Sequence, residues 1–476
     1  MRSVWLLVGL LQAGVAQAAS LDNLEMGGPW GTPAATDATA VWWSPAGLAM
    51  GHGTRVLIEG APTFAVINVD RSDPHGGPDQ IRLQGAVPFA GVATDLGLHG
   101  LGVGVGVGAP YVRGGTETPD LGPVRYQLRD GSIQTAAIMM GAGYAWKDKV
   151  AVGAGLHVLH NTWSALLDKD NLPDLADQIN AMGQDPGYTD ADLENADYGA
   201  ALDFQGLSDW AVSWSAGLQL RPLEPVTVSL TWIQGFHVDN TGPVDIAFGC
   251  PPQSDTLGRF GAESFGICDS AVHANAVVGY DLPSRLHGGI QVKPTPELSL
   301  EAMGGVVFWS AFQDYAISIQ DVAANNPELP EDTLPLVQRD QAWARDNHDT
   351  FWAGLDAKGT LADRFTLGGR MIYDATAIPS SALSANNYDA NTVIMGGMLA
   401  VRVVKQVQLG ASWSHYFLAS RTVTDSAFSM SLDPALRPET RYDYPQSNGS
   451  YSGRVDRLGI TARVLLGGFG EAQDGK

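Results

Sequence analysis

The sequence has little cysteine, little positive charge and, after residue 20, no long apolar run. It holds only 2 cysteines, and its 28 lysines and arginines stand against 51 aspartates and glutamates, for a formal net charge of −23. Nucleic-acid binding relies on clustered positive charge, so the acidic balance and the lack of a basic stripe exclude that class. No stretch after residue 20 approaches the roughly 20 apolar residues of a membrane helix, so a membrane protein of this sequence must be a β-barrel.

The N terminus is typical of an exported chain. Arg2 supplies a positive start, Val4–Val15 an apolar core and Ala16–Ala18 a small-residue cleavage pattern, which predicts a signal peptide over residues 1–19.

The two cysteines, Cys250 and Cys268, lie close together in a stretch rich in glycine, proline and polar residues. Export favours a disulfide between them, and two free thiols are the alternative. A metal site would need further ligands that this spacing does not supply, so no metal and no cofactor are expected.

From about Thr54 onward, segments of alternating apolar and polar or small residues recur, separated alternately by very short turns and by long polar loops. This is the pattern of an outer-membrane barrel, and about fourteen segments can be counted, an even number as bacterial barrels require. The expected short turns are Lys147–Lys149, Arg221–Pro225, Pro294–Pro296, Ala362–Asp363 and Lys405–Gln406. The expected long connections are 113–125, 164–208, 240–270, 320–347 and 424–448. Within the second of these, Leu172–Met182 has apolar residues at helical spacing, which predicts a loop helix.

One segment, Gly100–Pro110, reads GLGVGVGVGAP. As a strand it has apolar side chains on one face and only glycine on the other. Its second half also fits G-x-G-x-x-A, but Pro110 follows where a helix should begin and no βαβ pattern surrounds it, which disfavours a nucleotide-binding loop. Glycine in a strand indicates either close approach of other chain or a bend.

Residues 20–53 precede the first strand and show no strand alternation. They are rich in small residues and hold Trp30, Trp42, Trp43 and Pro45. About eight strands is the limit for a lumen that wall side chains alone can fill, so a wider barrel needs other material inside it. We therefore expect residues 20–53 to form a plug, residues 54–467 the transmembrane barrel and residues 468–476 a C-terminal tail.

Three motifs resemble the FadL/TodX-type outer-membrane transporters of long-chain fatty acids and other hydrophobic compounds. Ala34–Ala49 is similar to the plug signature of that family, Leu282–Gly289 to its Leu-Pro strand entry, and Ser447–Tyr451 to the start of its last strand. Two departures stand out. Ser44 occupies the place of the family's asparagine, so that only a hydroxyl is left to bond plug to wall, and a tail follows the last strand near Leu466.

The resemblance implies an all-β, fourteen-stranded antiparallel barrel with an N-terminal plug, and roles for particular residues. The third strand of the family bends inward and leaves a lateral opening for ligand, and by our count that strand is the glycine run; the alternative is that its glycines only relieve crowding against the plug. The expected residues are Trp42, Trp43, Ser44, Pro45 and Ala46 for plug and gating, and Gly104, Gly106, Gly108 and Pro110 for the lateral opening.

Arginines predicted to face the lumen are candidates for a ligand head group, namely Arg285, Arg370 and Arg457. The alternative is that they pair with lumen acids such as Glu301, Asp374 and Asp356 to hold the barrel.

The expected function is passive, ligand-gated transport of long-chain fatty acids or other hydrophobic small molecules across the outer membrane of a Gram-negative bacterium, by a monomer embedded in outer-membrane lipid and lipopolysaccharide. The alternatives are an aromatic or hydrocarbon channel of the same architecture and a diffusion pore or structural barrel without apolar ligand. A barrel enzyme such as a lipid hydrolase is a further rival, because His157, His160, His287 and His415 accompany many serines, but the G-x-S-x-G elbow is missing.

Overall fold

The structure is a computed structural model that describes residues 21–72, 75–114, 116–117, 122–181, 183–185, 187–264, 268, 271–326, 338, 340–426 and 447–466. The predicted signal peptide and C-terminal tail therefore lie outside the described residues.

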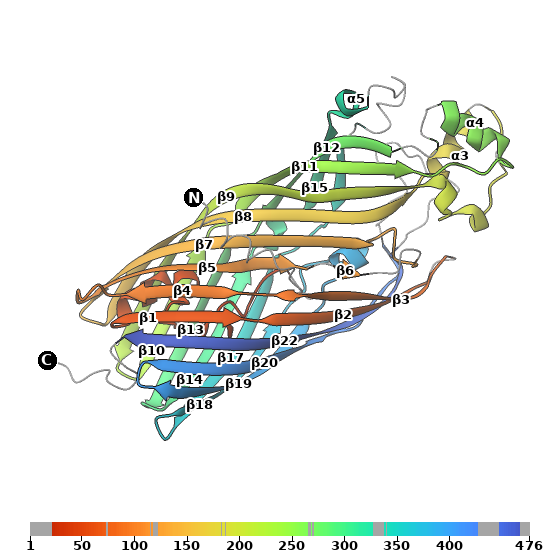
Figure 1. Ribbon diagram of the computed structural model, residues 1–476. Coiled ribbons are helices and arrows are strands. Elements are labelled where there is room, and N and C mark those ends of the chain that lie inside the picture. Colours follow the sequence, from red (N-terminus) through yellow and green to blue (C-terminus); the bar gives the residue numbers. More distant parts are fainter. Residues whose placement is uncertain are drawn as a thin grey trace.

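The strands form one closed antiparallel barrel of 14 strands (Figure 1). Several of the barrel strands are each built from two consecutive pieces, because both pieces pair with the same neighbouring barrel strand, as β1 and β2 do with β22. The barrel closes where the first strand pairs with the last, from Thr54↔Leu466 to Gly60↔Ile460. The all-β barrel and its strand number are thus confirmed.

The strands are β1 Thr54–Gly60, β2 Pro62–Arg71, β3 Gly77–Ala86, β4 Phe89–Thr94, β5 Leu101–Arg113, β6 Thr116–Glu117, β7 Asp130–Trp146, β8 Val150–Asp170, β9 Gly199–Leu223, β10 Val226–Ile233, β11 Phe236–Phe248, β12 Ala271–Leu282, β13 Arg285–Thr295, β14 Leu298–Val307, β15 Asp314–Gln320, β16 Asp340–Ala344, β17 Thr350–Leu361, β18 Phe365–Asp374, β19 Thr392–Val404, β20 Val407–Leu418, β21 Arg421–Val423 and β22 Gly449–Leu466. The helices are η1 Gly28–Trp30, α2 Ala40–Trp43, η2 Pro45–Met50, α3 Leu172–Ala181, η3 Asp190–Asp192, η4 Ala196–Tyr198, α4 Thr256–Ser264, η5 Trp309–Ala311, α5 Val322–Asn325, η7 Ser380–Ala382 and η8 Ala385–Asn387.

Alternation along each strand sorts side chains between lipid and lumen. In β18, Leu367 and Met371 are 47% and 45% exposed, whereas Arg370 between them is 7% exposed. The apolar outer face suits the hydrocarbon of a bilayer, and the polar inner face suits an enclosed lumen. No helix in the described ranges is long and apolar enough to cross a membrane.

The two ends of the barrel differ as expected. At one end, which we call the turn end, strands are joined by the predicted short turns; Lys147 and Asp148, like Ala362 and Asp363, have positive φ angles, as tight primed hairpin turns require. At the other end, the loop end, the long connections carry α3, α4 and α5 (Figure 1). The predicted loop helix is confirmed as α3, whose apolar face is buried.

Candidate functional site

The start of the described chain, residues 21–53, lies inside the barrel (Figure 1), and we call it the N-terminal segment. It is almost wholly buried, with Trp42 and Trp43 only 1% and 2% exposed. Its central part is compact, because α2 is followed at once by η2, and η2 packs against β5, β7, β8 and β9.

The wall beneath η2 is made of glycine. A Cβ added to Gly102 of β5 would lie 2.1 Å from the carbonyl oxygen of Leu48, and one added to Gly153 of β8 would lie 2.3 Å from the carbonyl carbon of Pro45. Gly106 leaves room in the same way, since its Cβ would be 3.0 Å from a methyl group of Val41. The bare face of the glycine run is therefore filled by backbone and side chains of the N-terminal segment.

The opposite wall binds the N-terminal segment with polar side chains. Arg370 of β18 donates to the carbonyl oxygens of Gly28, Pro29 and Gly31 at 2.9–3.2 Å while its Nε lies 3.0 Å from an Asp356 oxygen. Further such contacts are Ala34 N to Glu301 Oε1 (3.0 Å), His287 Nε2 with Trp43 O (2.8 Å), Ser414 Oγ to Glu25 Oε1 (2.7 Å) and Arg463 Nη2 to Asp37 Oδ2 (3.3 Å).

Arg285 joins the N-terminal segment to β5. Its Nη1 lies 2.7 Å from an oxygen of Asp22, and its guanidinium carbon lies 5.2 Å and 5.1 Å from the ring centroids of Trp42 and Tyr111. With Arg285 2% exposed and Asp22 6% exposed, this ion pair is buried.

The third strand of the barrel, β5, bends inward after Gly108. Its pairing with β4 ends at Phe89↔Gly108, and its register with β7 shifts between Gly108 and Tyr111. Beyond that point the N-terminal segment, and not β3, pairs with β5: Asn23 N donates to Pro110 O (2.9 Å) and Val112 N donates to Leu21 O (2.8 Å). Pro110 has no N–H for a ladder, which favours such a departure.

The strand on the far side of the bend is β3. Among the described residues its strand pairing with the β5–β7 connection is limited to β6, at Arg82↔Glu117 and Leu83↔Thr116. One further contact joins the two, because Val124 N of the connection donates to Asp79 Oδ2 of β3 at 3.4 Å. We call Ala109–Arg113 the β5 bend. Between β3 and the β5 bend, the wall is closed by a cluster of packed side chains made up of Ala61, Val87, Ala109 and Val112. The ladder of backbone hydrogen bonds that seals the rest of the barrel is interrupted here.

Above the N-terminal segment, toward the loop end, lies a small cavity of about 40 Å³ that is partly open to solvent. Leu21, Ile133, Trp309, Phe312 and Ile378 give it an apolar and aromatic surface. The lining residues that carry polar groups are Arg113, Tyr315, Arg345, Asn347, Asn387, Tyr388 and Asp389. An apolar surface with oriented polar groups is the usual form of a small-molecule site.

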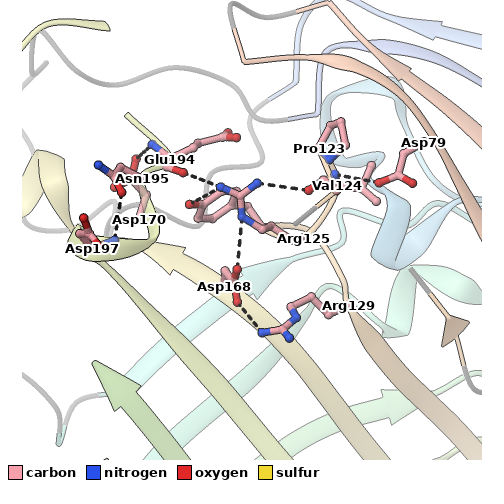
Figure 2. Close-up of polar contacts among 12 residues, drawn as sticks. Asp79, Pro123, Val124, Arg125, Arg129, Asp168, Asp170, Glu194, Asn195 and Asp197 are labelled. Carbon is pink, nitrogen blue, oxygen red and sulfur yellow. Dashed lines mark hydrogen bonds and ion pairs between the residues drawn. The ribbon is translucent and has the colours of Figure 1, made fainter. Parts of the chain in front are cut away.

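A network of ion pairs holds the connections at the mouth (Figure 2). Arg125 Nε lies 3.3 Å from Asp168 Oδ2, and Arg129 Nη1 lies 3.0 Å from Asp168 Oδ1. Arg125 also donates to the backbone oxygen of Glu194, whose carboxylate pairs with Arg71 at 2.7 Å. The β5–β7 connection is thereby tied to the β8–β9 connection.

The β8–β9 connection packs on α4 of the next long loop. Tyr188 and Tyr198 both donate to Asp255 Oδ2, at 2.7 and 2.9 Å, and burial together with this hydrogen bond raises the pKa of both phenols above the usual range. Cys250 and Cys268 form a disulfide in the same lobe, as predicted.

The predicted site residues fall into two groups. Trp42–Ala46 and Gly104–Gly108 meet one another where the N-terminal segment packs on β5, β7, β8 and β9. Each predicted head-group arginine has an acidic partner instead of facing the cavity: Arg285 with Asp22, Arg370 with Asp356, and Arg457 with Glu59 at 3.1 Å.

Ser44, in the place of the family's asparagine, has a buried hydroxyl without a hydrogen-bond partner in the described part of the chain. The amide of Gln219 and the hydroxyl of Thr231 on the adjoining wall are likewise unpartnered there. Polar groups without partners among the described residues thus occur both on the N-terminal segment and on the wall.

Two arginines that the sequence reading did not select, Arg113 and Arg345, line the cavity. Arg113 is the last residue of β5, the strand of the glycine run. The alternation of side chains along that strand could therefore have predicted its position above the bend. Arg345 lies in the short connection between β16 and β17, where no periodicity marks which side chains turn inward.

One pair resembles part of a hydrolase triad. His157 Nε2 lies 3.2 Å from Ser215 Oγ, but both residues are buried beneath the N-terminal segment, at 0% and 1% exposure. His157 Nδ1 has no hydrogen-bond partner among the described residues, whereas a triad histidine is oriented by a carboxylate there.

A closed barrel of 14 strands with an apolar outer face and a folded segment in its lumen defines a plugged outer-membrane protein. Residues 12–450 match the family described as outer membrane protein transport protein (OMPP1/FadL/TodX). The chain belongs to this family, whose members named below are transporters and channels, and it is a protein of the outer membrane.

Solved structures agree on the fold. A FadL homologue from Pseudomonas aeruginosa is 14% identical with a TM-score of 0.72, covering 95% of this chain and 99% of that one. The P. putida toluene transporter TodX is 12% identical with a TM-score of 0.64, covering 90% and 94%. The monoaromatic hydrocarbon channel CymD is 14% identical with a TM-score of 0.61, covering 94% and 98%. A comparison with curated protein sequences found no match.

Proposed function

We propose that this protein carries hydrophobic small molecules, long-chain fatty acids or hydrocarbons, passively across the outer leaflet of the outer membrane and releases them sideways through the barrel wall at the β5 bend. The observation that carries the proposal is the interrupted ladder, where the N-terminal segment in place of β3 pairs with β5. A wall closed only by side chains can open without the loss of a strand-to-strand ladder.

The route has three parts. Ligand enters the apolar cavity beneath the loop end, which Leu21 of the N-terminal segment helps to line. Movement of Leu21–Asn23 away from β5 connects the cavity with the bend. Ala61, Val87, Ala109 and Val112 then form a small, apolar threshold toward lipid. The remainder of the N-terminal segment, with Trp42–Ala46, stays on the glycine wall and blocks the aqueous lumen.

The test is uptake of radiolabelled oleate and toluene by cells that lack their own transporter and express this protein. We expect uptake of at least one compound, driven by its gradient, and no conductance for salt or sugars in planar bilayers because the lumen is filled. A correctly inserted barrel that takes up neither compound would contradict the proposal, and a large salt conductance would identify a diffusion pore.

The bend can be tested separately by replacing Val87 with Trp, which fills the threshold from the β3–β4 junction. Uptake should fall at least tenfold at equal surface level. The matched variant Val92→Trp changes an apolar residue of β4 that pairs with Val105 beside the glycine run, away from the bend. If Val87→Trp transports like the unmodified protein, ligand leaves by another path.

A further inference from the structure

The outer face of the barrel carries two arginines in one row where β22, β2 and β3 lie side by side (Figure 1). Val66 of β2 pairs with Arg454 of β22 on one side and with Arg82 of β3 on the other. Both arginines are exposed, whereas their strand neighbours Val455 and Leu83 are buried inside the barrel. The two guanidiniums therefore flank Val66 on the side of the wall that faces lipid, and we call Arg454, Val66 and Arg82 the arginine row.

The arginine row stands at the upper edge of the apolar outer band. On β2 and β22, outward side chains nearer the turn end are apolar, with Phe64 48%, Leu458 47% and Ile460 72% exposed. Val66 lies two residues beyond Phe64, which at the rise and tilt of barrel strands is about 5 Å higher along the membrane normal. Because the long loops of an outer-membrane barrel face the outside of the cell, this is the level of the head groups in the outer leaflet.

A polar groove of about 520 Å³ lies directly above the arginine row. Its outward residues are paired across the same three strands, namely Ser452, Asn68 and Gln80 in one row and Ser450, Asp70 and Pro78 in the next. By the same measure these rows lie about 10 and 16 Å above Phe64. The described lining holds hydroxyls, amides and two carboxylates, without a basic or an aromatic side chain. Such groups can both donate hydrogen bonds to and accept them from the hydroxyls of a sugar.

The two guanidiniums are available for a ligand. In the part of the chain that the structure describes, neither Arg82 nor Arg454 forms an ion pair. Arg82 donates from Nε to Gln80 Oε1 at 2.9 Å, and Gln80 Nε2 donates to Asn68 Oδ1 at 3.0 Å. This chain of hydrogen bonds links the arginine row to the groove and leaves both Nη atoms of Arg82 open.

The acids nearest to the arginine row do not neutralise it. Asp456 lies in the row below, and its Oδ1 accepts hydrogen bonds from His415 Nδ1 at 2.8 Å and from Trp413 Nε1 at 3.2 Å. Glu117 of β6 is opposite Arg82 in register, and no ion pair joins the two. A bound anion would therefore meet guanidiniums that have no carboxylate partner.

The outer face is different on the far side of the loop end. The strands β11 and β12 contain no lysine or arginine, and they present Asp239, Asp245 and Asp281 to the outside. Phosphate groups would be repelled there and attracted to the arginine row. In a chain with a formal net charge of −23, two adjacent outward arginines mark one place for an anionic lipid.

We propose that this surface binds one lipopolysaccharide molecule of the outer leaflet, with its phosphates on Arg82 and Arg454, its sugars in the groove and its acyl chains along Phe64 and Leu458. Guanidiniums bind phosphates through paired, charge-assisted hydrogen bonds. Along the strands the surface is apolar, then cationic, then polar, which is the order of acyl chain, phosphate and sugar in such a glycolipid. A phospholipid would leave the groove empty. The inference concerns the outside of the wall and does not depend on the proposed function.

The experiment titrates the full-length protein in detergent micelles with lipopolysaccharide that lacks the long polysaccharide, and counts bound molecules by native mass spectrometry. The unmodified protein should bind the first molecule roughly tenfold more tightly than it binds phosphatidylglycerol, which offers a phosphate without the sugars. Arg82→Gln/Arg454→Gln should bind lipopolysaccharide roughly tenfold more weakly, because both paired contacts to phosphate are lost. Dephosphorylated lipopolysaccharide should bind the two proteins equally.

Lys149→Gln/Arg364→Gln is the matched control, since both residues are exposed at the turn end and their loss removes the same charge far from the groove. It should bind lipopolysaccharide like the unmodified protein. Asn68→Ala/Gln80→Ala tests the groove, and it should weaken binding of lipopolysaccharide while binding of phosphatidylglycerol is unchanged. All these positions are on the surface, and the heat-dependent gel mobility of each variant verifies a folded barrel.

Equal affinity of the unmodified protein for lipopolysaccharide and phosphatidylglycerol would overturn the inference. Equal losses of lipopolysaccharide affinity in Arg82→Gln/Arg454→Gln and in the turn-end control would also overturn it, because charge alone would then explain binding. If the groove variant binds lipopolysaccharide like the unmodified protein, the arginine row takes any phosphate head group and the assignment of a glycolipid fails.

Discussion

The N-terminal segment rests between two unlike walls. The wall formed by β5, β7, β8 and β9 presents glycine and touches α2 and η2 through van der Waals contact, as at Gly102 and Gly153. In the described part of the chain, the hydrogen bonds of this wall to the segment join Leu21 and Asn23 to the end of β5. The wall formed by β13 to β22 reaches across with charged and polar side chains, as at Arg285 and Arg370. The first wall sets how closely the segment can approach, and the second sets where along the barrel it is held.

The difference bears on the movement of the N-terminal segment that we propose. Glycine forms no side-chain hydrogen bond, so displacement of α2 and η2 along that wall breaks weak contacts, each worth about 0.1–0.2 kcal/mol per atom pair. Displacement of Leu21–Asn23 also breaks their backbone hydrogen bonds with β5. On the charged wall each contact is directional and costly to leave unmade. Movement of the segment therefore requires exchange of partners on the charged wall, where water or ligand can replace them.

The largest effect is expected on the charged wall. Asp22→Asn removes the acid partner of Arg285 and leaves a guanidinium that is 2% exposed without its counter-charge. The free energy of unfolding, measured by denaturant titration in micelles, should fall by about 3–5 kcal/mol. Asp456→Asn is the control, because its pair with His415 is partly exposed, and should cost less than about 1 kcal/mol. Equal losses of unfolding free energy in the two variants would mean that the buried Asp22–Arg285 pair stabilises the protein no more than the exposed pair.

On the glycine wall the expected loss is smaller. Gly102→Ala places a methyl group 2.1 Å from the Leu48 carbonyl oxygen, so backbone must shift, and overpacking of this kind costs about 1–3 kcal/mol. Gly369 of β18 is the control. It faces outward, and an added Cβ would meet no atom nearer than the Gly396 oxygen at 3.9 Å. A neutral Gly102→Ala in the same titration would show that the segment does not press on this wall.

The smallest effect concerns acidity near the loop end. Burial raises the pKa of Asp389 to about 6, although hydrogen bonds from Ala377 and Thr376 oppose the rise. A folded-state pKa above the unfolded value means that the folded loop binds more protons, so stability is greatest below about pH 4 and is lost as pH rises through about 6.

Hydrogen exchange of the loop at residues 375–391 should accordingly be slower at pH 5 than at pH 8, by about tenfold after correction for intrinsic rates. Asp389→Asn should remove this dependence, and amides of β5 and β7 beside the glycine wall should not show it. A pH dependence of equal size in the loop at residues 375–391 and in β5 and β7 would contradict the difference that we draw between the two walls.

The barrel could be predicted from the sequence because side chains along each strand point alternately to lipid and to the lumen. Apolar residues such as Leu367 therefore mark the outer face, and charged residues such as Arg370 mark the inner face. The helix α3 could be predicted for the same reason, from the helical spacing of its apolar residues. The residues of the cavity could not be predicted, because Arg345 and Asp389 lie in connections that have no periodic pattern of apolar residues. The partners of Arg285 were also missed: its acid, Asp22, lies far away in sequence within a segment that has no regular pattern.

The central claim is that Leu21–Asn23 must leave β5 for ligand to cross. It is tested most directly with Leu21→Cys/Val112→Cys, which places two thiols on neighbouring positions beside the Asp22↔Tyr111 bridge. Uptake of whichever compound the unmodified protein carries should be lost when the pair is oxidised and should return on reduction, with each single cysteine variant unaffected by either treatment. Undiminished uptake by fully cross-linked protein would contradict the account.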